Sequence, residues 1–165
     1  MDVLILVVTM TGTAEMLAED VVAAHGSEHT MRMVLAERFS PAELQQATNL
    51  LVISSTYGAG EVPDPGKPLF AALEKQPDQL AHLRFGVVSL GDMVYSDTFA
   101  NGGLHWDRLL GDAGARRLSP PLLLDASSGE DASSQTLSWV AHWLQAAADG
   151  PELQAVEKDA WQSPS

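Results

Sequence analysis

The sequence contains no cysteine among its 165 residues. Disulfides, CxxC redox chemistry, thiolate zinc sites and iron–sulfur clusters ligated by this chain are therefore excluded. If the protein handles electrons, a bound cofactor must carry them. Basic residues are also scarce, because nine Lys and Arg oppose 22 Asp and Glu and leave a formal net charge of −13. Such a surface repels phosphate backbones and anionic lipid, which disfavours nucleic-acid and membrane binding and favours basic partners.

Long apolar runs are absent as well. The first residues, MDVLILVV, carry an acid at position 2 and only six apolar residues before Thr9. This segment is too short for a membrane span and lacks the basic start of a signal peptide, so we expect a cytoplasmic protein. The length and the 45% hydrophobic content fit one globular domain. We place that domain at residues 1–148 and expect a tail without predicted structure at 149–165.

Apolar, β-rich segments alternate with helical ones along the chain. Strands are predicted at residues 3–8, 30–36, 50–53, 85–90 and 117–124. The last of them suits a sheet edge, because Pro120 and Pro121 interrupt its start. Helices are predicted at 14–25, 69–75, 104–112 and 132–147, and Ser40 with Pro41 predicts a further helical turn. The alternation indicates an α/β three-layer sandwich with a five-stranded parallel sheet.

Ligands of such sheets bind beyond the carboxyl ends of the strands, where the strand order reverses. The loop after the first strand carries three hydroxyls and a glycine at a helix amino end, which supply the donors that an anion needs. Its residues are Thr9, Met10, Thr11, Gly12, Thr13 and Ala14. The alternative is that Thr11 or Thr13 only caps the helix. The loop is neither a Walker A motif nor a GxGxxG motif.

The loops after the third and fourth strands each carry one of the two tyrosines of the chain. The former contains Ser55, Thr56, Tyr57, Gly58, Ala59 and Gly60, and the latter Leu90, Gly91, Asp92, Tyr95, Asp97, Thr98, Phe99 and Ala100. Both loops should meet at the same sheet edge, so the tyrosines could sandwich a planar ring. The alternative is that each tyrosine only packs over the end of the sheet.

Three ordered motifs, T-x-T-G-T-A-E, S-S-T-Y-G-A-G-E and L-G-D-x-x-Y-x-D-T-F, span these loops. Together they resemble the short-chain flavodoxins of the MioC type and the flavodoxin-like domains of diflavin reductases and sulfite reductase. The resemblance extends from Val3 to about Leu144. It implies a flavodoxin-like fold with strand order 2-1-3-4-5 and an FMN cofactor at the reversal between the first and third strands.

The resemblance also implies a role for each loop. Residues Thr9 to Ala14 would hold the FMN phosphate, and Ser55 to Gly58 would line one side of the ring with Tyr57 beside it. Leu90 to Ala100 would form the other side, with Tyr95 stacked on the ring. Asp125, at the end of the fifth strand, matches an acid near the flavin in diflavin reductases. The chain departs from the family pattern in having Met10 where Gln is frequent and one extra residue between Tyr95 and Phe99.

These inferences predict an FMN-binding carrier that moves single electrons from a flavin reductase to an acceptor redox protein, a non-catalytic role rather than an enzyme with its own substrate. The partners are expected to dock on an acidic rim around the flavin that contains Glu61, Asp64, Asp92 and Asp97. One alternative is an NAD(P)H-dependent FMN or quinone reductase, which would need a substrate pocket beside the ring. A second alternative is an interaction module without flavin.

Two further motifs favour structural interpretations. His105-Trp106-Asp107 could be half of a metal site, but no second His lies at ligand spacing, and a solvated helix face is favoured. Trp139 and Trp143 lie four residues apart on the last helix, where core packing is expected.

Overall fold

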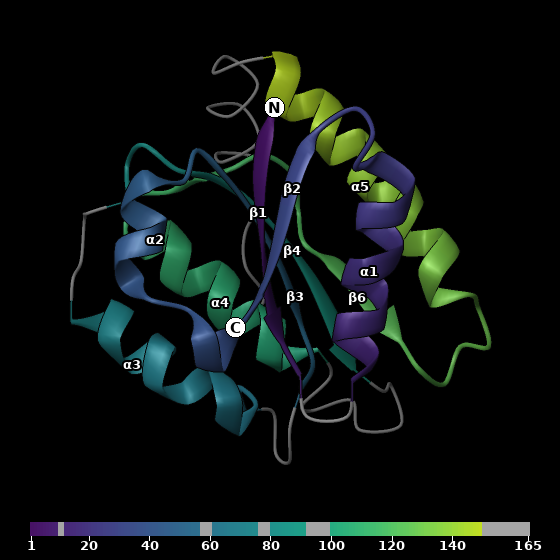
Figure 1. Cartoon of the computed structure of the whole chain (residues 1–165). Coiled ribbons are helices and arrows are strands. Elements are labelled where there is room, and N and C mark those ends of the chain that lie inside the picture. Colours follow the sequence, from purple (N-terminus) through teal and green to yellow (C-terminus); the bar gives the residue numbers. More distant parts are fainter. Residues whose placement is uncertain (10–11, 57–60, 76–79, 92–99, 150–165) are drawn as a thin grey trace.

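The computed structural model describes residues 1–9, 12–56, 61–75, 80–91 and 100–149. Its centre is a parallel sheet in the order β2-β1-β3-β4-β5, with β6 also paired to β4 (Figure 1). The strands are β1 (Asp2–Val8), β2 (Thr30–Leu35), β3 (Asn49–Ser54), β4 (Arg84–Gly91), β5 (Arg116–Arg117) and β6 (Leu122–Asp125). The predicted fold class and strand order are therefore confirmed.

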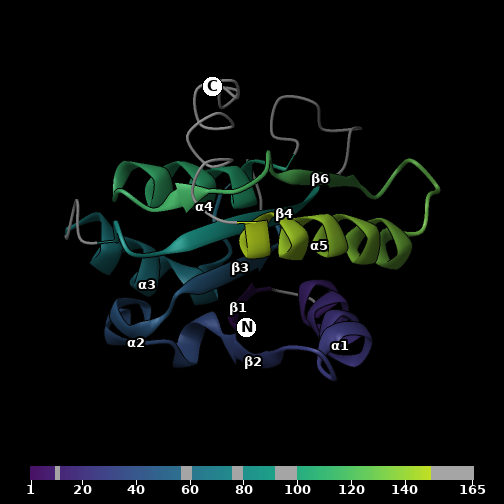
Figure 2. The same ribbon diagram turned by 90° about the horizontal axis from the view of Figure 1, so that it is seen from above.

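Helices cover both faces of the sheet (Figure 2). The helices are α1 (Thr13–His25), α2 (Pro41–Gln46), α3 (Lys67–Glu74), α4 (Asn101–Asp112) and α5 (Ala132–Asp149), and two 3-10 turns span Ala36–Arg38 (η1) and Asp64–Gly66 (η2). Helices α1 and α5 pack on one face, and α2, α3 and α4 on the other. No helix of the described ranges is long and apolar enough to cross a membrane.

Strand β1 shows why the sequence forms a sheet buried on both faces. Its even-numbered residues Leu4, Leu6 and Val8 pack into the core under α2, α3 and α4. Its odd-numbered residues Val3, Ile5 and Val7 pack into the core under α1 and α5. Since successive side chains of a strand point to opposite faces, a continuous apolar run is needed here rather than an alternating one.

Three predicted elements differ from the structure. The predicted fifth strand is two short strands, β5 and β6, because Pro120 and Pro121 cannot donate hydrogen bonds to β4. Helix α4 begins at Asn101, three residues before the predicted start, and includes Gly102 and Gly103 in its first turn. The helical spacing within 14–25 predicts one apolar face formed by Met16, Leu17, Val21, Val22 and Ala24. Leu17 and Val21 are buried there, but Met16 is 50% exposed and Ala24 is exposed as well.

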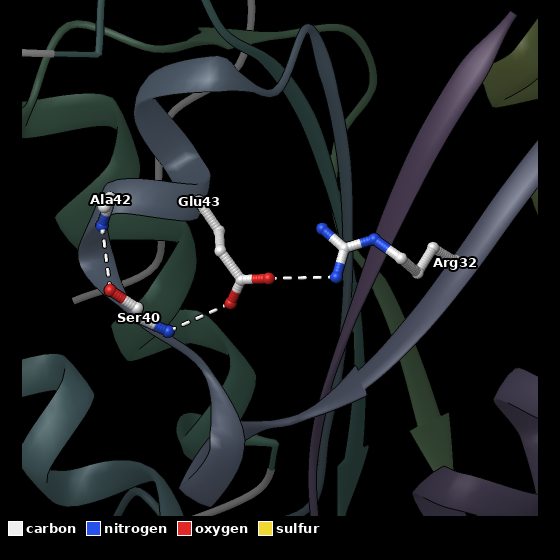
Figure 3. Close-up of polar contacts among 4 residues, drawn as sticks. All are labelled: Arg32, Ser40, Ala42 and Glu43. Atoms are coloured by element: carbon white, nitrogen blue, oxygen red, sulfur yellow. Dashed lines mark hydrogen bonds and ion pairs between the residues drawn. The ribbon is translucent and has the colours of Figure 1, made fainter.

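The predicted helical turn at Ser40 is helix α2. Its amino end is capped by residues that lie close together in the sequence. Ser40 Oγ accepts a hydrogen bond from the Ala42 N–H, and Glu43 Oε2 accepts one from the Ser40 N–H at 3.0 Å (Figure 3). This arrangement is a capping box. Glu43 Oε1 also lies 2.9 Å from Arg32 Nη1, which joins the helix to β2. The hydrogen bond from the Ser40 N–H and the contact with Arg32 lower the pKa of the Glu43 carboxyl.

Candidate functional site

The carboxyl ends of four strands meet at one edge of the sheet, the lower edge in Figure 1. In the strand register, Val8 of β1 lies beside Ser54 of β3, and Ser54 lies beside Ser89 of β4. Gly91 lies beside Asp125 of β6. The ends of all the predicted binding loops are thereby brought together, at the reversal of strand order between β1 and β3.

The loop after β1 leads directly into helix α1. Thr9 Oγ1 accepts a hydrogen bond from the Gly12 N–H at 2.9 Å, and Gly12 has a left-handed backbone conformation with φ 95°. No side chain of the described residues, Thr13 included, accepts a capping hydrogen bond from the first N–H groups of α1. Ala14 is buried under the sheet edge. Among the described residues, therefore, no side chain occupies the first N–H groups of α1, and the positive end of the helix dipole favours an anion there.

The loop after β3 starts with two residues that are tied to other elements. The Ser55 N–H donates a hydrogen bond to the Val8 carbonyl at 2.9 Å, which joins the ends of β3 and β1. Thr56 Oγ1 accepts a hydrogen bond from the Gly102 N–H of α4 at 2.9 Å. The start of this loop is therefore hydrogen-bonded to β1 and to α4.

Of the loop predicted at 90–100, three residues are described, and the structure places two of them, Leu90 and Gly91, at the end of β4. Leu90 packs partly into the core of the α1 and α5 face. The Gly91 carbonyl accepts a hydrogen bond from the Ala126 N–H at 2.8 Å. Ala100 is buried, has a left-handed conformation with φ 56° and precedes the first residue of α4. Its carbonyl accepts a hydrogen bond from Ser89 Oγ at 2.5 Å.

Asp125 stands at the end of β6, on the same edge. Its Oδ1 accepts hydrogen bonds from the Ser127 N–H at 2.9 Å and from Ser127 Oγ at 2.7 Å. The carboxylate thus orders the turn that follows β6. The remaining predicted site residues lie outside the described residues: Met10, Thr11, Tyr57, Gly58, Ala59, Gly60, Asp92, Tyr95, Asp97, Thr98 and Phe99.

Two acids of the expected rim share a lysine that sequence reasoning missed. Lys67 Nζ lies 2.8 Å from Glu61 Oε2 and 2.9 Å from Asp64 Oδ1. These carboxylates raise the pKa of the Lys67 ammonium. All three side chains are about half exposed, so the pairs are weak, but they reduce the local charge from −2 to −1. The spacing of Asp64 and Lys67, three residues apart, was the only sequence signal for this cluster.

The segment His105-Trp106-Asp107 is not the solvated helix face that the sequence favoured. Trp106 is fully buried and packs edge-on against Phe70 at a centroid distance of 5.0 Å. Asp107 is 1% exposed and forms a bidentate ion pair with Arg117 of β5, with contacts of 2.7 and 2.8 Å. Burial raises the pKa of the Asp107 carboxyl, and Arg117 opposes that rise. The described residues contain no group of three or more His, Asp or Glu placed to hold a metal ion.

The chain is similar in sequence and fold to known flavin-binding proteins. A sequence model of the flavodoxin family matches residues 5–139. The chain belongs to the flavodoxin family. Flavodoxin YqcA of Escherichia coli K12 is 34% identical over 147 residues, which cover 84% of this chain and 93% of that protein. The flavoprotein alpha-component of Bacillus subtilis NADPH sulfite reductase is 32% identical over 153 residues, which cover 90% of this chain and 24% of that protein.

Solved flavodoxin structures have the same fold. A cysteine-to-alanine mutant of flavodoxin from Pseudomonas aeruginosa superimposes with a TM-score of 0.79 at 34% identity, over 88% of this chain and 98% of that one. Membership of the flavodoxin family confirms the predicted FMN cofactor.

The described residues fit the phosphate of this cofactor. Among the described residues other than its chain neighbours, no atom lies within 4 Å of a Cβ added to Gly12, so these residues leave the space beside it open. The helix end beside it presents N–H groups that no described side chain caps, together with the exposed Thr13. Open space, uncapped donors and a hydroxyl are the features that an anion requires.

Proposed function

We propose that this flavodoxin is an electron carrier that takes single electrons from a flavin reductase and passes them to an acceptor redox protein. When bound, FMN supplies the redox chemistry, and the protein supplies binding, orientation and electrostatics. The proposal rests on the uncapped amino end of α1 at the reversal of strand order. It is supported by the similarity to Flavodoxin YqcA, of which the match covers 93%. We further propose that the protein acts in the cytoplasm.

In this proposal the chain holds the phosphate without any Lys or Arg in its first loop. Neutral N–H and O–H donors must then surround the phosphate, and the Thr9 hydroxyl keeps their loop in shape through its bond to Gly12. The two sides of the ring are assigned to the loops that start at Ser55 and Leu90, with Tyr57 and Tyr95 beside the ring. Asp125 stays in the proposed site as an acid near the ring.

The test of this assignment is a calorimetric titration with FMN and with riboflavin, which lacks the phosphate. We expect stoichiometric FMN binding and much weaker riboflavin binding. Replacing both Thr11 and Thr13 by Ala removes two hydroxyl donors to a charged group, each worth about 1.5–3 kcal/mol. The control replaces the exposed Thr30 and Thr48, at the opposite edge of the sheet, by Ala. Equal FMN affinity of the two double variants would contradict the phosphate assignment.

The partners are proposed to dock on the rim that includes Glu61, Asp64, Asp92 and Asp97. Electron transfer requires the ring to come close to the partner's cofactor, so the docking face must include the exposed ring edge. Opposite charge at this face would accelerate encounter more than it would tighten the complex. Stopped-flow reduction by a reductase with a basic docking face, measured at low and high salt, tests this part of the proposal. A rate that does not depend on salt would contradict it.

A further inference from the structure

The first turn of helix α4 touches the ends of β3 and β4 directly. A Cβ added to Gly102 would lie 2.2 Å from the Ser55 carbonyl oxygen and 2.8 Å from Thr56 Cα. A Cβ added to Gly103 would lie 2.3 Å from Ser89 Cβ. Side chains at these two positions are therefore excluded, and the helix backbone itself forms the contact.

Two hydroxyls from the strand ends bind the same turn. Ser89 Oγ accepts a hydrogen bond from the Gly103 N–H at 2.9 Å and donates one to the Ala100 carbonyl at 2.5 Å. Thr56 Oγ1 accepts a hydrogen bond from the Gly102 N–H at 2.9 Å. Ser89 is fully buried, so its two bonds are not exchanged with water. These bonds satisfy two of the amino-terminal N–H groups of α4 that the helix itself cannot pair.

The Ser89 bond also holds a strained residue. Ala100 has φ 56°, a conformation that is unfavourable for a residue with a Cβ atom. Such a conformation persists only where surrounding contacts impose it. The carbonyl of Ala100 is held by Ser89 Oγ, and its side chain is buried.

We propose that Thr56 and Ser89 form a hydroxyl clamp that sets the distance between the two sides of the flavin site. The loop assigned to one side of the ring continues from Thr56, and the loop assigned to the other side ends at Ala100. The clamp joins these two points through the first turn of α4, so both sides are positioned by one rigid helix. Thr56 and Ser89 are positioning residues. This inference rests on the proposed function, because it assumes that these loops flank FMN.

The main test replaces Thr56 by Val, which keeps the shape of the side chain and removes the acceptor for the Gly102 N–H. Thr56→Ser keeps the hydroxyl and serves as the rescue variant. We expect the FMN dissociation constant to rise about tenfold in Thr56→Val and to stay within twofold of wild type in Thr56→Ser. We also expect the midpoint potential of the bound flavin to shift in Thr56→Val only, because the ring would lie in a changed environment.

Ser89→Ala tests the buried half of the clamp, and the double variant tests whether the two halves act together. Breaking either half frees the same helix turn. The double variant should therefore bind FMN about 10- to 30-fold more weakly than wild type, whereas two independent tenfold losses would multiply to about 100-fold. The control is Thr136→Val on α5, because Thr136 is fully buried and its hydroxyl has no hydrogen-bond partner among the described residues. This control should leave FMN affinity within twofold of wild type.

Urea unfolding of the FMN-free proteins separates positioning from folding. The clamp is supported if Thr56→Val weakens FMN binding and shifts the potential while its stability stays close to that of Thr56→Ser. Wild-type affinity and potential in Thr56→Val and Ser89→Ala would overturn the clamp while leaving FMN binding intact. Equal loss of affinity in Thr136→Val would also overturn it. Failure of the wild-type protein to bind FMN would instead overturn the proposed function.

Discussion

Helices α1 and α4 begin at the same edge of the sheet but use their amino ends in opposite ways. Each helix follows a residue in the left-handed region, Gly12 with φ 95° and Ala100 with φ 56°. No described side chain caps α1, and no described atom beyond the chain neighbours lies within 4 Å of a Cβ added to Gly12. In α4, hydroxyls of Thr56 and Ser89 bind the first N–H groups, and the helix backbone lies against the strand ends.

The difference shows how one structural element serves two purposes. The free N–H groups of a helix start are donors that water, a side chain or a ligand must satisfy. In α1 no described side chain caps them, and we assign them to a phosphate. In α4 the protein satisfies them itself, and the helix becomes a fixed support for the loops beside it. Helix α2 shows a third solution, the capping box of Ser40 and Glu43 within its own sequence.

The largest effect is expected where α4 is joined to β5. Asp107→Ala leaves Arg117, with an 11% exposed side chain, without its carboxylate partner, which should cost about 3–5 kcal/mol of unfolding free energy. The corresponding bond of α1 runs from Ser133 Oγ of α5 to Asp20 Oδ2 at 2.8 Å. Ser133→Ala should cost only about 1 kcal/mol, because this bond is partly exposed. Urea unfolding of both variants measures the difference.

A double variant distinguishes lost pairing from lost packing. Asp107→Ala combined with Arg117→Met removes both charges and keeps an apolar stem over the Phe85 ring, 5.5 Å from the Arg117 guanidinium carbon. It should be more stable than Asp107→Ala alone, because the largely buried guanidinium is removed together with its carboxylate. Equal stability of the single and double variants would contradict this account.

The second prediction compares the glycines at the two helix starts. Gly102→Ala brings a Cβ to 2.2 Å from the Ser55 carbonyl oxygen, and overpacking of this kind costs about 3 kcal/mol. Gly12→Ala meets no atom of the described residues beyond its chain neighbours and should be destabilised by its positive φ, about 1 kcal/mol. Thermal or urea unfolding of the FMN-free proteins checks the order. A more stable Gly102→Ala than Gly12→Ala would show that the contact of α4 with the strand ends is loose.

These contacts also mark how far the sequence could predict the structure. The apolar run at 3–8 and the turn signal at Ser40-Pro41 predict their elements, because strand burial and capping are local properties. The hydroxyl clamp and the Asp107–Arg117 pair join residues that only folding brings together. Thr56 and Gly102, for example, are 46 positions apart. The pair Gly102-Gly103 is a usable signal of close backbone approach, but glycine disfavours helix, so the sequence alone predicts a loop there.

The third prediction concerns the helix that is capped by its own sequence. Ser40→Ala should destabilise the protein by about 1 kcal/mol. Glu43→Gln removes the charge whose pKa the Ser40 N–H and Arg32 lower from the ordinary 4.5. Because the folded-state pKa is depressed, the stabilisation by ionised Glu43 is present above pH 4.5. It is lost as the pH falls through the lower folded value. Wild type and Glu43→Gln should therefore differ most at neutral pH and converge in acid, as urea unfolding across pH can show.

The smallest effect is expected at the start of α3, whose first residue, Lys67, is paired with two acids of the proposed rim. Lys67→Gln frees Glu61 and Asp64 and makes the proposed rim more negative by one charge. Reduction by a basic-faced reductase should then accelerate about two- to threefold at low salt. The gain should disappear at high salt, because exposed charges are screened beyond about 8 Å already at physiological ionic strength. The matched control is Lys75→Gln, at the other end of the same helix, which changes the net charge equally. If both variants accelerated reduction equally, the partner would respond to net charge, and the rim would not be its docking face.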